Sequence, residues 1–179
     1  MTARQRQPVI RPARSEDEHA IGALHVACFD DLFAGLLVDC LPPADERAER
    51  ERSWTGPIGC PRDRHALLVA ERVARVCGFV AVGPTRDADG DRETRGELRT
   101  VMVADDERGM GVGRALLGAA ERAMRDHGFS SATLWVVPEN ASAVRCYERC
   151  GWHGDGSDNL ITVSGHDVRA VRYHKQLAP

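Results

Sequence analysis

Three alternating glycines in the middle of the chain have the type and spacing to bind an anion. The segment reads Arg108, Gly109, Met110, Gly111, Val112, Gly113, Arg114. It lies where a predicted strand turns into a predicted helix, so side chains do not obstruct the main-chain N–H groups. Such groups at a helix N-terminus bind phosphate or pyrophosphate. The sequence therefore predicts a pyrophosphate site formed by the backbone of residues 108–114.

Two other phosphate-binding motifs do not fit this turn. A dinucleotide fingerprint would end in Gly where this chain has Arg114, and a Walker loop would end in Gly-Lys-Ser or Gly-Lys-Thr. NAD and ATP are therefore disfavoured. Alternating glycines also serve tight turns and helix starts that bind nothing, so the turn alone leaves both interpretations open.

Asn140 and Tyr147 form a second candidate group further along the chain. They are seven residues apart in a predicted helix over 140–150. Because seven residues make two turns, both side chains are expected on one face of that helix. This spacing favours a binding function for the glycine turn over a purely structural one.

The elements that must position these residues follow from hydrophobic periodicity and from start and stop signals. A strong apolar repeat predicts a helix from Val112 to His127, and Gly128 ends it. The predicted strands are 9–11, 97–103, 133–137 and two hairpins, 65–71 with 76–82 and 160–163 with 168–174. Further helical segments are expected at 15–30, 32–41 and 45–54. The segment 83–96 is predicted to be a mobile polar loop, too charged to pack, that borders a substrate site.

Composition excludes several classes of protein. With 179 residues, 42% of them hydrophobic and 28% charged, the chain is expected to form a single domain over 1–179. Its 24 Lys and Arg against 27 Asp and Glu argue against nucleic-acid binding. The chain has no apolar run of the roughly 20 residues that a membrane-spanning helix needs, and its first fourteen residues have no signal-peptide core. A cytoplasmic protein without a membrane partner is expected.

The six cysteines do not predict a metal centre. No Cys-x-x-Cys pair is present, although Cys146 and Cys150 lie one helical turn apart and could both face a metal. Buried free thiols are the more common reason for such a pair. Asp155, Asp158 and Asn159 lack the spacing of a calcium loop. No metal is therefore expected.

Taken together, the motifs resemble the GNAT-type N-acetyltransferase superfamily. Its members carry an Arg/Gln-x-x-Gly-x-Gly/Ala turn, then a strand, an Asn and a Tyr, which here are Arg108, Gly111, Gly113, Asn140 and Tyr147. The resemblance runs from residue 10 to residue 173 and includes the segment Tyr147-Glu-Arg-Cys-Gly-Trp152.

The resemblance implies a fold of the α/β (α+β) class. Its sheet would be mixed, twisted and mostly antiparallel, flanked by helices, with a central strand pair that splays to admit acetyl-CoA. The backbone of Val101, Met102 and Val103 would pair with the pantetheine arm, residues 108–114 would hold the pyrophosphate, and Asn140 would bond to the cofactor arm. Self-association as a homodimer through the final strands is also implied.

The resemblance further implies catalytic roles. Tyr147 would be the general acid that protonates the departing thiolate, the alternative being a core aromatic whose hydroxyl has a partner. Glu97 would be the general base, directly or through water, although a strand-edge glutamate is usually a solvated charge and a neutral amine needs no base. The acids at 105–107 would add negative charge near the pyrophosphate.

The expected function is acetyl transfer from acetyl-CoA to a primary amine of a small molecule, by direct attack in a ternary complex. Trp135 stands where ribosomal-protein acetyltransferases tend to carry an acid, which favours a small acceptor. Two alternatives stay open. They are acetylation of a protein N-terminus or lysine, and a non-catalytic acyl-CoA sensor.

Overall fold

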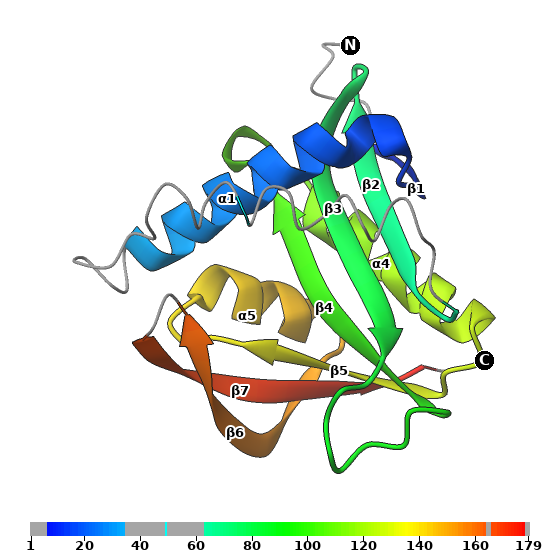
Figure 1. Ribbon diagram of the computed structural model, residues 1–179, viewed down its shortest axis with the longest axis vertical. Coiled ribbons are helices and arrows are strands. Elements are labelled where there is room, and N and C mark those ends of the chain that lie inside the picture. Colours follow the sequence, from blue (N-terminus) through cyan, green and yellow to red (C-terminus); the bar gives the residue numbers. More distant parts are fainter. Residues whose placement is uncertain (1–6, 35–48, 50–62, 164–165, 178–179) are drawn as a thin grey trace.

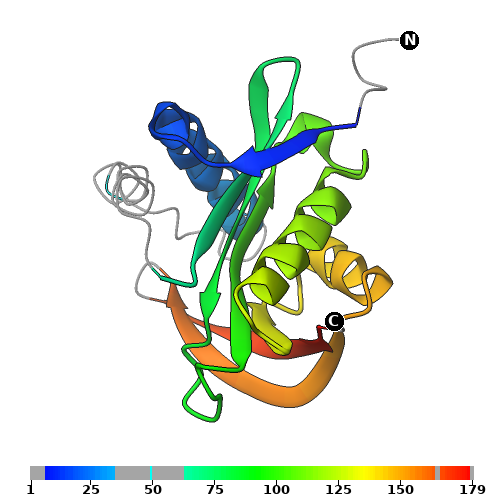
Figure 2. The same cartoon turned by 90° about the vertical axis from the view of Figure 1, so that its right-hand side faces the viewer.

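The computed structural model describes residues 7–34, 49, 63–163 and 166–177. They form one seven-stranded sheet with helices on both faces (Figures 1 and 2). The strands are β1 (Val9–Pro12), β2 (Ala66–Arg72), β3 (Arg75–Pro84), β4 (Arg95–Val103), β5 (Ser131–Val136), β6 (His153–Val163) and β7 (His166–Gln176). The helices are α1 (Glu18–Ala34), α4 (Val112–Asp126), α5 (Ala141–Arg149) and two short 3-10 helices, Ser15–Asp17 and Asp105–Glu107.

The strands lie in the order β1-β2-β3-β4-β5-β7-β6. Every neighbouring pair is antiparallel except β4 and β5, which run parallel. The predicted mixed and mostly antiparallel sheet flanked by helices is therefore confirmed, and so are both predicted hairpins.

Helix α4 packs its apolar side against one face of the sheet, the face it shares with α5 (Figure 2). Leu116, Ala120 and Met124 recur at helical spacing and are all fully buried. The helix lies close to β3 because residue 78 is glycine. A Cβ there would lie 2.9 Å from Leu116 Cδ1 and 2.8 Å from the carbonyl oxygen of Met102.

Helix α1 covers the opposite face (Figure 2). Its Ile21 is buried against Val69 of β2 and Phe79 of β3 in a second apolar cluster. An ion pair fixes the start of the helical segment, since Arg11 Nη1 of β1 lies 2.6 Å from Asp17 Oδ2. The Arg11 guanidinium holds the pKa of Asp17 below its usual range.

The first helix is longer than the sequence predicted. Helix α1 continues to Ala34 and includes Leu32 and Phe33, where the sequence predicted the start of a separate helical segment. The rest of that segment, and all of the predicted helix over 45–54 except Glu49, lie outside the described residues. None of the helices within the described ranges is long and apolar enough to cross a membrane.

The prediction that the polar loop is too charged to pack was wrong. β3 and β4 extend into the predicted loop, so the loop itself comprises only residues 85–94. Asp87 of this loop forms hydrogen bonds to the sheet. One carboxylate oxygen of Asp87 accepts from Trp135 Nε1 at 2.8 Å and the other from Thr133 Oγ1 at 3.1 Å. Asp89 forms a bidentate ion pair with Arg172 of β7, with N···O distances of 2.7 and 2.8 Å. Asp87 and Asp89 pack against the sheet because each carboxylate meets a partner.

Candidate functional site

The central strands β4 and β5 diverge. Their parallel ladder has three pairs, which join residues 95–97 to residues 131–133 and end at Glu97 and Thr133. β4 nevertheless continues to Val103 and β5 to Val136. From Leu98 to Val103, the edge of β4 that faces β5 therefore has no strand partner among the described residues (Figure 1).

A register shift helps β4 to turn away from β5. Ala81 of β3 pairs with Thr100 and the next residue, Val82, pairs with Leu98, so Arg99 is an extra residue in β4. Such a bulge bends a strand and increases its twist. Its position, two residues beyond the last β4–β5 pair, is consistent with the divergence.

The open edge exposes backbone groups rather than side chains. Val101 and Val103 pack into the core on the α4 side, whereas Met102 packs into the α1 cluster. Their N–H and C=O groups on the β5 side are then free to pair with an extended ligand, as in strand addition. One carbonyl already has a partner, because the Cys28 thiol of α1 donates to Val103 O at 3.4 Å.

The glycine turn adopts a backbone conformation that favours glycine. Gly109 and Gly111 have φ of 75° and 83°, in the left-handed region. A Cβ at either position would meet no atom of the described residues within 4 Å, so conformation rather than crowding requires glycine, and the described part of the chain leaves the space beside the turn open. Among the described residues no side chain caps α4, so the first turn of this helix presents N–H groups without a partner there, at the positive end of the helix dipole.

The acids that precede the turn are neutralised. Glu107 is buried in an ion pair with Arg72, at 2.8 Å between Oε2 and Nη1, and Asp106 lies 2.9 Å from Arg75 Nη2. Asp105 pairs with Arg108 at 2.9 Å. The added negative charge that the sequence suggested near a pyrophosphate is therefore offset by these three arginines.

The cations at the turn are differently placed. Besides Asp105, Arg108 also contacts Asp31 of α1, at 3.1 Å. Arg114 is exposed and has no ion-pair partner among the residues that the structure describes. An incoming anion could therefore pair with Arg114 without competing with a carboxylate of the described residues, whereas Arg108 is already paired.

Asn140 lies at the N-cap of α5 rather than inside the helix. Its side-chain oxygen accepts hydrogen bonds from Ala143 N at 3.2 Å and from Ser142 Oγ at 3.0 Å. Capping occupies the oxygen and leaves the NH₂ group as a hydrogen-bond donor. The sequence placed Asn140 and Tyr147 in the same helix. In the structure Tyr147 lies within α5, and Asn140 is the residue that caps its start.

Tyr147 is 7% exposed and packs into the main core cluster. Its hydroxyl has no hydrogen-bond partner within the described part of the chain. Burial raises the pKa of the phenol above its ordinary value. Tyr147 is thus a core aromatic, as in the alternative weighed from the sequence, but the described residues supply no partner for its hydroxyl.

Glu97 is the last residue of β4 that pairs with β5. It is 3% exposed, so the alternative of a solvated strand-edge charge is wrong. Arg86 of the 85–94 loop holds its carboxylate, with Nη2 2.5 Å from Oε1 and the backbone N 3.0 Å from Oε2. The carboxylate thus lies where β4 and β5 begin to diverge, at the Glu97–Thr133 pair, which we call the vertex. It is paired there with the guanidinium of Arg86.

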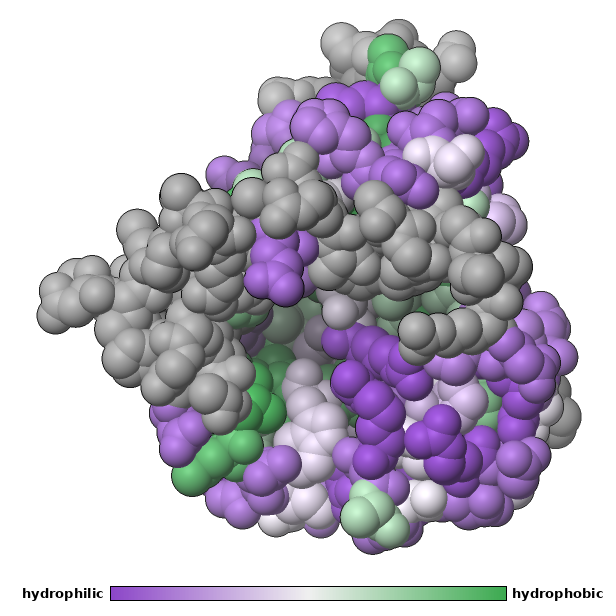
Figure 3. Space-filling view, viewed as in Figure 1, coloured by the Kyte–Doolittle hydropathy of each residue, from purple (hydrophilic) through white to green (hydrophobic). Residues whose placement is uncertain are grey.

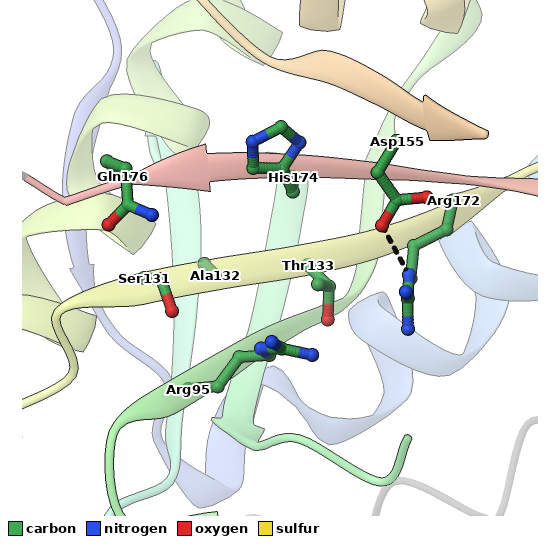
Figure 4. Close-up of a pocket in the computed structure, with 8 residues that line it drawn as sticks. All are labelled: Arg95, Ser131, Ala132, Thr133, Asp155, Arg172, His174 and Gln176. Carbon is green, nitrogen blue, oxygen red and sulfur yellow. Dashed lines mark hydrogen bonds and ion pairs between the residues drawn. The ribbon is translucent and has the colours of Figure 1, made fainter. Parts of the chain in front are cut away.

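Sequence reasoning missed the polar cluster beside this vertex. Arg172 of β7 is surrounded by Asp87, Asp89 and Asp155, and the Asp155 contact is 2.6 Å. Arg172 and Asp155 also line a pocket of about 140 Å³, together with Arg95, Thr133 and His174 (Figure 4). The charges lie far apart in sequence, and no local motif indicates that β6, β7 and the loop bring them together.

The thiols and other metal-binding side chains do not form a metal centre within the described residues. Cys146 and Cys150 are free, half-buried thiols, and burial raises the pKa of Cys146. No three His, Cys, Asp or Glu side chains gather in metal-binding geometry in residues 7–34, 49, 63–163 and 166–177.

The chain is similar in sequence to known acetyltransferases. A mycothiol acetyltransferase from Cellulomonas flavigena is 36% identical over 113 residues, which cover 61% of this chain and 30% of that protein. The chain thus spans about a third of the length of the mycothiol acetyltransferases that it matches.

Two solved structures share the fold over nearly the whole chain. Ribosomal-protein-alanine N-acetyltransferase from Brucella melitensis has a TM-score of 0.71 and 25% identity, covering 94% of this chain and 99% of that one. The Salmonella typhimurium acetyltransferase yncA, solved with its cofactor acetyl-CoA, has a TM-score of 0.70 and 20% identity, covering 97% and 96%. The second likeness concerns the fold alone.

The sequence profile of the acetyltransferase (GNAT) family matches residues 29–152. That range contains the diverging part of β4 and β5, the glycine turn, Asn140 and Tyr147. Since the match covers more than half of the chain and runs through all of these features, the chain belongs to the acetyltransferase (GNAT) family.

Proposed function

We propose that this protein transfers an acetyl group from acetyl-CoA to a primary amine of a small molecule, by direct attack in a ternary complex. One observation carries the proposal. The open edge of β4, from Leu98 to Val103, is followed by one short 3-10 helix and the glycine turn, and α4 then starts at Val112 without a side-chain cap among the described residues. An extended arm that ends in a diphosphate fits this succession of an unpaired strand edge and an anion site.

The residues fit coenzyme A in three places. The backbone of Val101, Met102 and Val103 pairs with the pantetheine arm, and the N–H groups of residues 108–114 bind the pyrophosphate. The NH₂ group of Asn140 donates to the arm from the N-cap of α5. The empty space beside Gly109 and Gly111 supports this assignment, because a phosphate can approach the backbone there.

Tyr147 acts as the general acid. The bound cofactor supplies a thioester, and the leaving thiolate needs a proton. The phenol of Tyr147 keeps its proton over a wide pH range because burial raises its pKa. Its hydroxyl has no competing partner in the described chain, so it is available to donate.

Glu97 acts as the general base on the attacking amine, directly or through a water molecule. Its position at the vertex supports the role, whereas its ion pair with Arg86 means that the proton must be taken up beside a guanidinium. A neutral amine could also attack without a base. A backbone N–H of the β4 edge polarises the thioester carbonyl, in the manner of an oxyanion hole.

The acceptor class has two candidates. The similarity to a mycothiol acetyltransferase supports a small-molecule acceptor. The 25% identity to a ribosomal-protein-alanine N-acetyltransferase supports a protein N-terminus as the second candidate. A single domain over 1–179, a cytoplasmic location, and self-association through β6 and β7 stay predictions.

The experiment is a thiol-release assay with acetyl-CoA, run in parallel on small primary amines and on peptides with free N-termini. Turnover of amines above peptides supports the proposal, and the reverse preference supports the second candidate. Calorimetry with coenzyme A separates a third outcome. Binding without turnover of any acceptor would contradict an enzyme and favour an acyl-CoA sensor.

A further inference from the structure

Trp135 is the first side chain of β5 beyond the last β4–β5 pair that points to the α1 face. Its neighbours Leu134 and Val136 are buried in the core on the α4 side. Because side chains alternate along a strand, Trp135 projects to the opposite face. Thr133, which precedes it on that face, is already paired in the ladder with Glu97.

This face is where an acceptor has to enter. In the proposed function the diphosphate end of the cofactor lies at the start of α4, on the face that α4 and α5 cover. The amine must then reach the diverging strands from the α1 face, which is hollowed in the space-filling view (Figure 3). Trp135 stands beside that approach, at the β5 side of the vertex.

The indole of Trp135 is held rigidly. Nε1 donates to Asp87 Oδ1 at 2.8 Å, and the guanidinium carbon of Arg172 lies 5.7 Å from the ring centroid. Asp87 is itself fixed, since its other oxygen accepts from Thr133 at 3.1 Å and from Arg172 at 3.4 Å. The Asp87 side chain is 11% exposed, so these bonds are largely shielded from water.

The charges around Trp135 disfavour an acidic acceptor. Asp87, Asp89 and Asp155 surround the guanidinium of Arg172, and Asp89 also lies 3.8 Å from Arg95 Nη1. Glu97, on the β4 side of the vertex, is matched by one arginine, Arg86. An ammonium group or an apolar stem is compatible with this excess of carboxylates and with an indole face, whereas a carboxylate would be repelled.

We propose that Trp135 determines acceptor specificity by selecting primary amines carried on an apolar, preferably aromatic, stem. Asp87 is the positioning residue that fixes the indole ring for this contact. The proposal deepens the proposed function and rests on it.

The test uses two acceptors that differ in one charge, benzylamine and para-aminomethylbenzoate, with acetyl-CoA as the donor. The wild-type protein is expected to prefer benzylamine. Trp135→Leu is expected to raise the KM for benzylamine about tenfold and to reduce the preference, with the KM for acetyl-CoA unchanged. Trp135→Phe keeps an aromatic ring and should retain more of the preference than Trp135→Leu.

Trp152→Phe is the matched control. The Trp152 indole also donates to a carboxylate, Glu121 Oε1 at 3.0 Å, but the side chain is fully buried and belongs to the core. Loss of that bond should lower the melting temperature without changing the preference between the two amines. Similar changes in preference for the Trp152 and Trp135 variants would overturn the inference.

The role of Asp87 is tested through Trp135. Asp87→Ala should raise the KM for benzylamine in the wild-type background and have no further effect on it when combined with Trp135→Leu. Asp87→Asn keeps an acceptor oxygen for Nε1 and should restore most of the wild-type KM. An equal effect of Asp87→Ala in both backgrounds contradicts positioning through the indole.

Failure of the inference and failure of the proposed function give different results. A wild-type protein that binds coenzyme A but acetylates no acceptor overturns both. A wild-type protein that acetylates other amines, but neither prefers benzylamine nor loses that preference in Trp135→Leu, overturns the inference alone.

Discussion

Glu97 and Thr133 form the last pair of the parallel β4–β5 ladder, and beyond them the two strands share no further pairing. This single register position places a buried carboxylate at the vertex of an opening. It also sets which side chains of each strand face the two sides of that opening. The predictions below test the groups that this arrangement brings together.

Replacing Tyr147 with Phe removes the only phenolic proton of α5 and preserves the ring that packs in the core. If Tyr147 is the general acid, kcat should fall about 100-fold, with the affinity for coenzyme A unchanged. Steady-state kinetics and calorimetry measure the two quantities. The matched control is Tyr173→Phe, which removes the contact to Glu148 but should leave kcat unaltered. Unchanged transfer by Tyr147→Phe at every pH would falsify the assignment.

Replacing Glu97 with Gln keeps the shape of the side chain and removes its basicity. If Glu97 is the general base, kcat/KM for the amine should fall about 100-fold at neutral pH, and coenzyme A should still bind. Arg86→Gln is the companion variant, because it breaks the same ion pair and keeps the carboxylate. Equal losses in the two variants would assign the effect to the ion pair rather than to a base.

The titration of Tyr147 can be observed directly, because the chain has two tyrosines. In Tyr173→Phe, the ultraviolet absorbance of the phenolate reports Tyr147 alone. Its midpoint is expected well above the ordinary value of 10.0, because burial raises the pKa. The unfolded chain releases this proton first as the pH rises. The free energy of unfolding should therefore fall between the unfolded and the folded pKa, and a midpoint near the ordinary value would contradict burial of the hydroxyl.

The glycine turn should respond to alanine according to backbone conformation. Gly111→Ala forces an alanine into a left-handed conformation, which costs about 1–2 kcal/mol, and it should weaken binding of coenzyme A. Gly113→Ala lies inside α4, where a Cβ would make ordinary contacts of 3.8 Å to Cys146 and Val103. It should leave folding stability unchanged or raise it. Chemical denaturation measures both effects, and equal destabilisation by the two variants would contradict the conformational argument.

The β2–β3 hairpin has a two-residue turn, Val73-Ala74, in which both residues have positive φ, of 51° and 56°. Such turns favour Asn-Gly, and a left-handed conformation costs a non-glycine residue about 1–2 kcal/mol. The double variant Val73→Asn, Ala74→Gly should therefore raise the free energy of unfolding by about 1 kcal/mol. The double variant should leave kcat and KM for acetyl transfer unchanged, since the turn contains none of the site residues. A lower melting temperature would show that the exposed Val73 contributes more than its turn conformation costs.

Local signals in the sequence determined most of the fold. The apolar repeat over Val112–His127 predicted α4, and the alternation of turn signals with short apolar runs predicted both hairpins. These signals are readable because helix periodicity and turn chemistry act between residues close in the chain. The glycine turn belongs to the same class, whereas the sequence placed Asn140 inside the helix and the structure places it at the N-cap.

The register between distant strands was decided by tertiary structure alone. The sequence cannot show that the β4–β5 ladder stops at Glu97 and Thr133, because that depends on a bulge at Arg99 and on packing against α4. Nor does it show that Asp87 reaches Trp135, or that Arg172 gathers three carboxylates from a loop and a strand. The loop looked too charged to pack for the same reason, since Arg172, the counter-charge of Asp87 and Asp89, lies more than eighty residues away along the chain. Local patterns fix which elements form, whereas long-range pairing of strands and charges fixes which side chains meet at the vertex.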